Sequence, residues 1–439
     1  MSKNWNQEQL EAITTRNTNI LVSASAGSGK TGVLVQRLVE LVTLDHIEID
    51  EILAMTFSED AANEMKKRLS SEISKLVLNA DDNNKQYLQS QLSKLSNAHI
   101  STIHSFCYSI LKNYYYLLGL SSKRVATLCD EATLKLYQNQ VLEEIIHEKS
   151  NNKEFQILCS MLCSRPEDLQ PVKNTILKVA NMANSQSNPM QWLENAKRDY
   201  STNLKNTHFY QVFMDYWHGR IYMLKDSFES LFQQLNEHYP DDVNRYEKLS
   251  LKYDTIRNLE NSHDFDDLRN HVYSCARLVC PTSPDAANTI YKENRERITT
   301  IEDEILSVPP VDVMNKMIKE NQCVIFELFN CVNLYFNKIE TLKNEKEIID
   351  FSDMEHFALQ LLREYDEVAS YYRNKFKQIM VDEFQDSNDV QDELVALICK
   401  ENNVFRVGDV KQSIYGFRHA LPSIMQSYKE KEDQLSYSI

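Results

Sequence analysis

The chain has 439 residues and a formal net charge of −16 at pH 7, because 64 acidic side chains outnumber 48 basic ones. At roughly 150 residues a domain, this length predicts two or more domains. The acidic balance argues against broad coating of duplex nucleic acid, since proteins that do this carry a basic footprint. No apolar run approaches the roughly 18 residues that cross a bilayer, and the polar start does not resemble a signal peptide, so we expect a cytoplasmic protein without membrane contact.

A glycine-rich loop follows the first predicted strand, Ile20–Val22, and precedes apolar residues at helical spacing. Gly27 and Gly29 let backbone N–H groups converge on phosphate oxygens at a helix N-terminus, where the helix dipole favours anions. Lys30 adds a point charge, and Thr31 places a hydroxyl on Mg²⁺. The loop departs from the G-x-x-x-x-G-K-[ST] pattern only in its first position, and we predict a phosphate loop rather than a glycine-rich turn. Its nucleotide-binding residues are Ala24, Ser25, Ala26, Gly27, Ser28, Gly29, Lys30 and Thr31.

The middle of the chain has the pattern of helices throughout, from about residue 121 to 347. Long amphipathic stretches run from His208 through Leu235 and from Val311 through Ile348. We therefore expect an all-helical inserted domain at 121–347, between a first part (1–120) and a second part (348–439) of one α/β domain with a parallel sheet.

Two local features of this middle region allow more than one explanation. Aromatic residues at positions 209, 210, 213, 216 and 217 have helical spacing, which favours packing in a core over an exposed stacking platform. The segment Asp350–Asp353 returns the chain to the α/β domain, and a helix cap at Ser352 or Asp353 explains its composition.

A second strand with functional side chains is predicted at residues 376–381. It delivers Asp382 and Glu383 to the carboxyl end of a strand, where ligands of open α/β sheets bind. Asp382 can hold Mg²⁺, and Glu383 can orient or deprotonate an attacking water, because phosphoryl transfer needs mainly positioning and charge neutralisation. A solvated strand end is the ordinary explanation of an isolated acidic pair, but the phosphate loop reverses that preference.

A third segment, residues 404–418, again runs from a strand into a Gly-Asp turn. The Gln412 amide can donate to a γ-phosphate and accept from water. Tyr415 and Phe417 offer flat faces to bases, and Arg418 offers a cation. Core packing explains the two aromatic residues equally well from this segment alone.

The two halves of this phosphate site lie more than 300 residues apart in the sequence. A nucleotide-binding domain with such a separation contains a large insertion, and insertions of this kind belong to motor proteins. Loops that follow the strands ending in Thr56, Thr102 and Asp409 are expected along one rim of the sheet, where a single nucleic-acid strand can cross them.

These motifs together resemble the UvrD/Rep-like helicases of superfamily 1, and among them the AddA branch. The resemblance rests on NQEQ (6–9), ASAGSGKT (24–31), LAMTFSEDAANEM (53–65), STIHSF (101–106), DEFQD (382–386) and GDVKQSIYGFR (408–418). It implies a RecA-like domain that uses ATP and Mg²⁺ to move along single-stranded DNA. Stacking of bases supplies about 1–3 kcal/mol each without net positive charge, so the acidic composition is compatible with this activity.

The resemblance also implies roles for individual residues. Gln9 is expected at the adenine edge, Lys30 at the β- and γ-phosphates, Thr31 and Asp382 on Mg²⁺, Glu383 at the attacking water and Gln412 at the γ-phosphate. The catalytic residues would then be Glu383, Gln412 and Lys30. The implied DNA-binding residues are Thr56, Phe57, Thr102, His104, Tyr415, Phe417 and Arg418.

At the level of the whole protein, the resemblance implies one component of a helicase–nuclease that works on duplex ends in double-strand break repair and recombination, with an AddB-like nuclease partner. A second motor domain and a nuclease segment are expected beyond the motifs found here, which makes this chain the N-terminal portion of a longer motor. The alternative is a module that binds ATP and DNA without appreciable turnover.

Overall fold

The structure is a computed structural model that describes residues 5–24, 27–238, 256, 259, 262–274, 286–413, 421–429 and 434–438. The chain divides into two compact units, which are described separately. The first unit contains Met1–Trp192 and Asn330–Ile439, and the second contains Leu193–Phe329. In the part of the chain that is described, no helix combines the length and apolar character that a membrane span requires.

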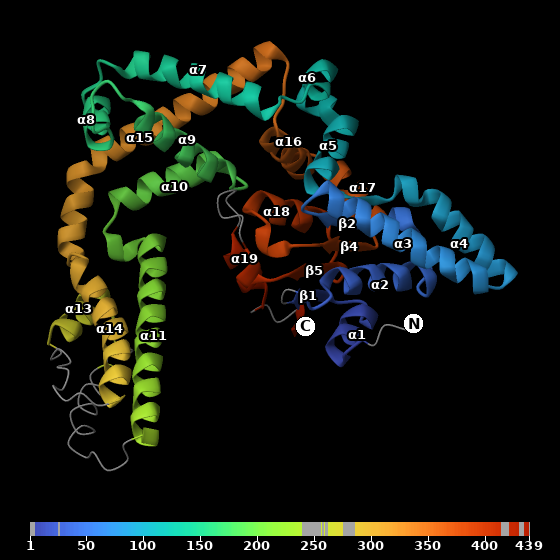
Figure 1. The fold of residues 1–439 in the computed structure, drawn as a ribbon. Coiled ribbons are helices and arrows are strands. Elements are labelled where there is room, and N and C mark those ends of the chain that lie inside the picture. The colour runs from blue at the N-terminus through green and yellow to red at the C-terminus, as the bar shows by residue number, and fades with distance from the viewer. Residues whose placement is uncertain are drawn as a thin grey trace. The chain divides into compact units, whose positions relative to one another are not determined.

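A six-stranded parallel sheet forms the centre of the first unit, in the order β3-β2-β4-β5-β1-β6. Its strands are β1 (Asn19–Ser23), β2 (Ile52–Thr56), β3 (His99–Thr102), β4 (Gln378–Val381), β5 (Val404–Gly408) and β6 (Gln434–Ser438). Strands β1 and β5, from opposite ends of the sequence, lie side by side (Figure 1). The predicted α/β class and parallel sheet are confirmed, whereas strand β6 was not predicted.

Helices cover both faces of this sheet because successive strand residues point to opposite sides. Ile20 and Val22 of β1 pack in one apolar core, while Leu21 packs in the other. The first core contains side chains of α1 (Gln7–Thr14), α2 (Lys30–Thr43), α3 (Glu59–Asn79) and α4 (Asp82–Lys94). The second contains side chains of α5 (Ile103–Tyr114), α16 (Phe351–Glu364), α17 (Asp366–Lys375), α18 (Asp389–Ile398) and α19 (Pro422–Lys429).

Short 3₁₀ helices complete the first unit at η1 (Ile49–Glu51), η2 (Leu95–Asn97), η3 (Tyr115–Leu118), η5 (Phe384–Asp386) and η6 (Val410–Gln412). Further α-helices follow at α6 (Ser122–Ala126), α7 (Glu131–Lys149), α8 (Lys153–Leu162) and α9 (Gln170–Asn184), and α10 (Pro189–Ser201) and α15 (Val311–Lys346) continue into the second unit.

A buried ion cluster fixes the junction between α15 and α16. The Lys343 ammonium lies 3.2 Å from Asp350 and 2.6 Å from Asp353. Asp350 is the N-cap of α16, and its side chain and that of Asp353 each accept from the other's backbone N–H. The predicted cap at Ser352 or Asp353 is therefore wrong, because the helix begins earlier and Asp353 occupies the third helical position.

The second unit contains η4 (Leu204–Asn206), α11 (His208–His238), α13 (Phe265–Ser274) and α14 (Ala286–Ser307) around one apolar core. Tyr210 and Trp217 lie in this core, but Phe209 and Tyr216 are 60% and 56% exposed. The prediction that the whole aromatic stripe is core is wrong for these two, because the stripe is wider than the face that α11 buries. The boundaries at 121 and 347 remain a prediction.

Candidate nucleotide-binding site

The glycine-rich loop between β1 and α2 has the backbone geometry of an anion site. Gly27 and Gly29 adopt φ angles of +78° and +89°, which residues other than glycine rarely adopt. Gly29 is the N-cap of α2, and no side chain caps the helix. The first N–H groups of α2 consequently lack the intrahelical partners that later residues have, which favours an anion at this position. Ser25 and Ala26 lie outside the described residues.

Helix α1 places Gln9 against this loop. Asn6 caps α1, and the Gln9 carbonyl oxygen accepts from the Asn6 N–H at 3.0 Å in a capping box. The amide nitrogen of the same side chain donates to the Ser28 carbonyl at 2.9 Å. Gln9 therefore connects the start of α1 to the phosphate loop.

Three side chains from the two ends of the chain converge at one ammonium group. Lys30 Nζ lies 3.5 Å from Glu383 Oε2 and donates to Gln412 Oε1 at 3.2 Å. The Gln412 amide nitrogen in turn donates to the Asp409 carboxylate. This arrangement leaves Lys30 bridging the strand ends β4 and β5, where parallel sheets of this kind bind ligands.

Asp382 occupies an environment that disfavours its charge. Burial raises the pKa of Asp382 to about 6, and the neighbouring charge of Glu383 adds to the rise. The Glu383 N–H donates to Asp382 Oδ1 at 3.0 Å, which offsets only part of this cost. A cation beside the carboxylate would restore its ionised form. Ser28 Oγ is a second buried group, without a hydrogen-bond partner among the described residues. Both observations fit the bound phosphate and Mg²⁺ that the resemblance implies.

Gln385 is a central residue that sequence reasoning missed. Its side chain is 1% exposed and donates to Glu383 Oε2 at 2.7 Å and to Asp386 Oδ2 at 3.1 Å. Its carbonyl oxygen accepts from the Asp409 N–H at 2.8 Å, which joins the loop after β4 to the loop after β5. The sequence places this glutamine between acidic residues, but no spacing indicates that its side chain faces inward.

The backbone around Gln385 is closely fitted. Glu383 adopts a left-handed conformation with φ +50°, so the regular alternation of strand β4 ends before it. A Cβ atom at Gly408 would lie 2.5 Å from Gln385 Oε1 and 3.1 Å from its backbone nitrogen. Glycine at 408 is therefore required for the contact between the two loops.

The residues predicted to contact DNA are placed in part. Thr56 and Thr102 are paired across β2 and β3, so both lie at the carboxyl edge of the sheet. Their hydroxyls have local partners: Thr56 donates to the Ser58 carbonyl at 2.9 Å, and Thr102 caps α5. Phe57, directly after β2, is half-buried. Tyr415, Phe417 and Arg418 lie outside the described residues.

His104 is anchored at the start of α5 rather than free. Its Nε2 lies 3.3 Å from Oε1 of the buried Glu355, which also accepts from the Gln391 amide at 2.7 Å. The imidazole packs edge-on against the Phe351 ring, with 5.2 Å between centroids. The side chain is nevertheless 38% exposed.

Comparisons with known proteins agree with this geometry. Residues 5–433 match the family model of the UvrD/REP helicase N-terminal domain. The chain is similar to the AddA subunit of the ATP-dependent helicase/nuclease from Lachnoclostridium phytofermentans (strain ATCC 700394 / DSM 18823 / ISDg), with 33% identity over 98% of this chain and 33% of the relative. The proteins with the same description from Thermoanaerobacter sp. (strain X514) and Clostridium botulinum (strain Alaska E43 / Type E3) are 32% and 31% identical, over 97% and 96% of this chain and 36% of each relative.

The chain thus spans about a third of the length of these curated relatives. The family match covers strands from both ends of the chain and the helices between them. This chain belongs to the family of the UvrD/REP helicase N-terminal domain.

Proposed function

We propose that this chain is the ATP-binding part of a DNA helicase, in which ATP hydrolysis drives movement along single-stranded DNA. The observation that carries the proposal is the convergence of Glu383 and Gln412 on Lys30, across nearly the whole length of the sequence. The UvrD/REP helicase match supports hydrolysis over the alternative of a binding module without turnover.

The residues at the sheet edge divide the work of phosphoryl transfer. The N–H groups at the start of α2 and the Lys30 ammonium hold the β- and γ-phosphates, and Gln9 faces the adenine edge. Thr31 and Asp382 would hold Mg²⁺, which neutralises phosphate charge when bound. Glu383 orients the attacking water and accepts its proton. Gln412, which holds Lys30, exchanges that bond for the γ-phosphate.

DNA binding is assigned to the loops at the same edge of the sheet. Thr56, Phe57, Thr102 and His104 contribute from the loops after β2 and β3, and Tyr415, Phe417 and Arg418 contribute from the segment after β5. The three aromatic rings stack on bases, while the hydroxyls and the arginine contact the DNA backbone. Gln385, which joins the β4 and β5 loops, links the nucleotide side to the DNA side.

The relatives' printed names supply the wider context. These helicase/nuclease proteins are subunits by description, which supports a nuclease partner of the AddB kind. We place the whole protein in the cytoplasm, at duplex DNA ends in double-strand break repair and recombination.

Hydrolysis of ATP with and without a single-stranded oligonucleotide tests the proposal. We expect the oligonucleotide to stimulate turnover by the wild-type chain, Lys30→Ala to abolish both turnover and nucleotide affinity, and Glu383→Gln to abolish turnover alone. Lys85→Ala, at an exposed position on α4, is the matched control and should behave as wild type. Nucleotide affinity that survives Lys30→Ala would contradict the phosphate-loop assignment. Tight binding with no turnover at any DNA concentration would favour the binding module.

A further inference from the structure

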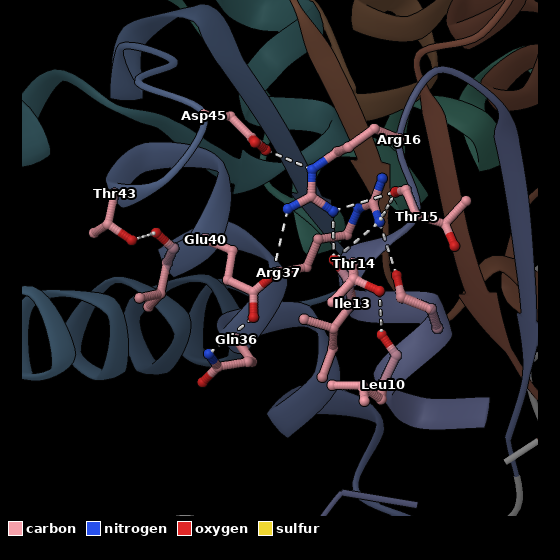
Figure 2. Close-up of polar contacts among 12 residues, drawn as sticks. Leu10, Ile13, Thr14, Thr15, Arg16, Gln36, Arg37, Glu40, Thr43 and Asp45 are labelled. Carbon is pink, nitrogen blue, oxygen red and sulfur yellow. Dashed lines mark hydrogen bonds and ion pairs between the residues drawn. The ribbon is translucent and has the colours of Figure 1, made fainter. Parts of the chain in front are cut away.

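A buried arginine on α2 grips the end of α1. Arg37 is 1% exposed, and its Nη1 donates to the carbonyl oxygens of Ala12 and Thr15, both at 2.7 Å, and of Ile13 at 3.3 Å (Figure 2). These carbonyls lie at the C-terminus of α1, where intrahelical hydrogen bonds cannot satisfy them. The positive charge also complements the negative end of the helix dipole.

The remaining faces of this guanidinium are held by the sheet. Nη2 donates to the Gln378 side chain of β4 at 3.2 Å, and the guanidinium carbon lies 4.6 Å from the centroid of the Phe405 ring of β5. The acidic residues nearby, Glu40 and Asp45, pair with Arg16 instead. Among the described residues, no carboxylate forms an ion pair with Arg37, so this buried cation is balanced mainly by oxygen dipoles. Burial accordingly lowers the pKa of Arg37 to about 9, and the charge of Arg16 adds to the effect.

The position of Arg37 connects it to the nucleotide site through two helices. Arg37 and Lys30 are seven residues apart on α2, which places them on one helix face about 10 Å apart. The carbonyls that Arg37 grips begin about one turn after Gln9, the residue that contacts the phosphate loop through Ser28. Helix α1 is therefore held at one end by the loop and at the other by Arg37.

Apolar packing does not replace this grip. Ala12 and Ile13 are fully buried, but hydrophobic contact has no preferred direction. A planar guanidinium with several fixed donors instead sets the orientation of the groups it binds, which a lysine cannot reproduce.

We infer that Arg37 is a positioning residue for nucleotide recognition: by fixing the C-terminus of α1, it holds Gln9 at the base end of the site. The inference rests on the proposed function, in which Gln9 faces adenine. Arg37 touches no nucleotide, and the phosphate-binding residues Lys30 and Thr31 keep their own support in α2.

The test compares binding of MgATP with binding of magnesium tripolyphosphate, which has no base. We expect Arg37→Lys and Arg37→Met to weaken MgATP binding about tenfold, an effect of the size that displacements below 1 Å produce. Tripolyphosphate affinity should change by less than about twofold. Hydrogen exchange should speed up in α1 and stay unchanged in α2. Arg165→Lys, at an exposed position, is the matched control.

A double-mutant cycle separates positioning from general stability. Once Gln9→Ala has removed the base contact, adding Arg37→Lys should cost no further MgATP affinity, because both changes act through the same side chain. If the Arg37 variants do not fold, Gln378→Met, which removes one partner of the guanidinium, should give a smaller loss of the same selectivity.

Three results would overturn the inference: unchanged MgATP affinity in the folded variants, equal losses for MgATP and tripolyphosphate, or additive effects in the cycle. Failure of the proposed function looks different, because the wild-type chain would then bind MgATP no better than Lys30→Ala does.

Discussion

Gln385 offers the sharpest test of how the β4 and β5 loops act together. In Gln385→Met, a side chain of similar length loses its bonds to Glu383 and Asp386 and leaves the Asp409 N–H without its acceptor. An unsatisfied buried N–H costs about 1–3 kcal/mol, and a hydrogen bond to a charged group contributes about 1.5–3 kcal/mol. Because the Glu383 side chain is 38% exposed, water replaces part of its lost bond. We therefore expect the free energy of unfolding to fall by about 2–3 kcal/mol.

The effect on turnover should be larger than the effect on binding. Without the Gln385 amide, Glu383 is no longer held beside Lys30, and misplacement of a catalytic group by about 1 Å costs up to about 100-fold in rate. Steady-state ATP hydrolysis with saturating single-stranded DNA should show a kcat about 100-fold lower and a KM for ATP within about twofold of wild type. Urea unfolding gives the stability change in parallel.

Gln360→Met is the matched control for this experiment. Gln360 is exposed on α16 and bonds to Glu364 one turn away, so its loss should change kcat and stability little. A Gln385→Met enzyme with wild-type kcat would refute the claim that this glutamine positions Glu383. A rise in KM at constant kcat would refute it as well, since that pattern belongs to a ground-state binding residue.

Three further predictions concern stability, each measured by urea unfolding. In magnesium-free buffer, Asp382→Asn should stabilise the protein by up to about 3 kcal/mol at pH 7.5, because a folded-state pKa of about 6 against 3.8 penalises the ionised form above pH 6; the gain should shrink at pH 5 and vanish below pH 4, and a pH-independent effect would contradict the buried carboxylate. Lys343→Met should destabilise by about 3–5 kcal/mol, since Asp350 and Asp353 lose their buried counter-charge, and by less at pH 5, where they take up protons; a neutral variant would contradict the ion cluster. Gly408→Ala should cost about 1–3 kcal/mol, because the added methyl group meets Gln385, and wild-type stability would show that the two loops are not closely packed.

The sequence predicts those parts of the site in which chemistry and local pattern coincide. The phosphate loop is recognisable because glycine, lysine and threonine have fixed spacing between a strand and a helix. Asp382 and Glu383 follow an apolar run, and parallel-sheet geometry places such a strand end at the ligand edge. The strand ends at Thr56 and Thr102 were predicted for the same reason and are confirmed as neighbours in the sheet.

The remaining features depend on contacts between distant segments. Arg37 has the same helical spacing as the apolar residues of α2, and only the packed structure shows that it faces the carbonyls of α1. Gln385 likewise has partners in two loops. Strand β6 has little apolar pattern of its own and gains its position by pairing with β1.

The central claim is that the two ends of the chain form one magnesium–nucleotide site. A double-mutant cycle on MgATP affinity, with Lys30→Ala, Asp382→Asn and the double variant, tests it most directly. If both residues act on one bound MgATP, the two losses should be non-additive by more than about 1 kcal/mol. Losses that add to within about 0.5 kcal/mol would mean that the two residues act independently, and would contradict the account.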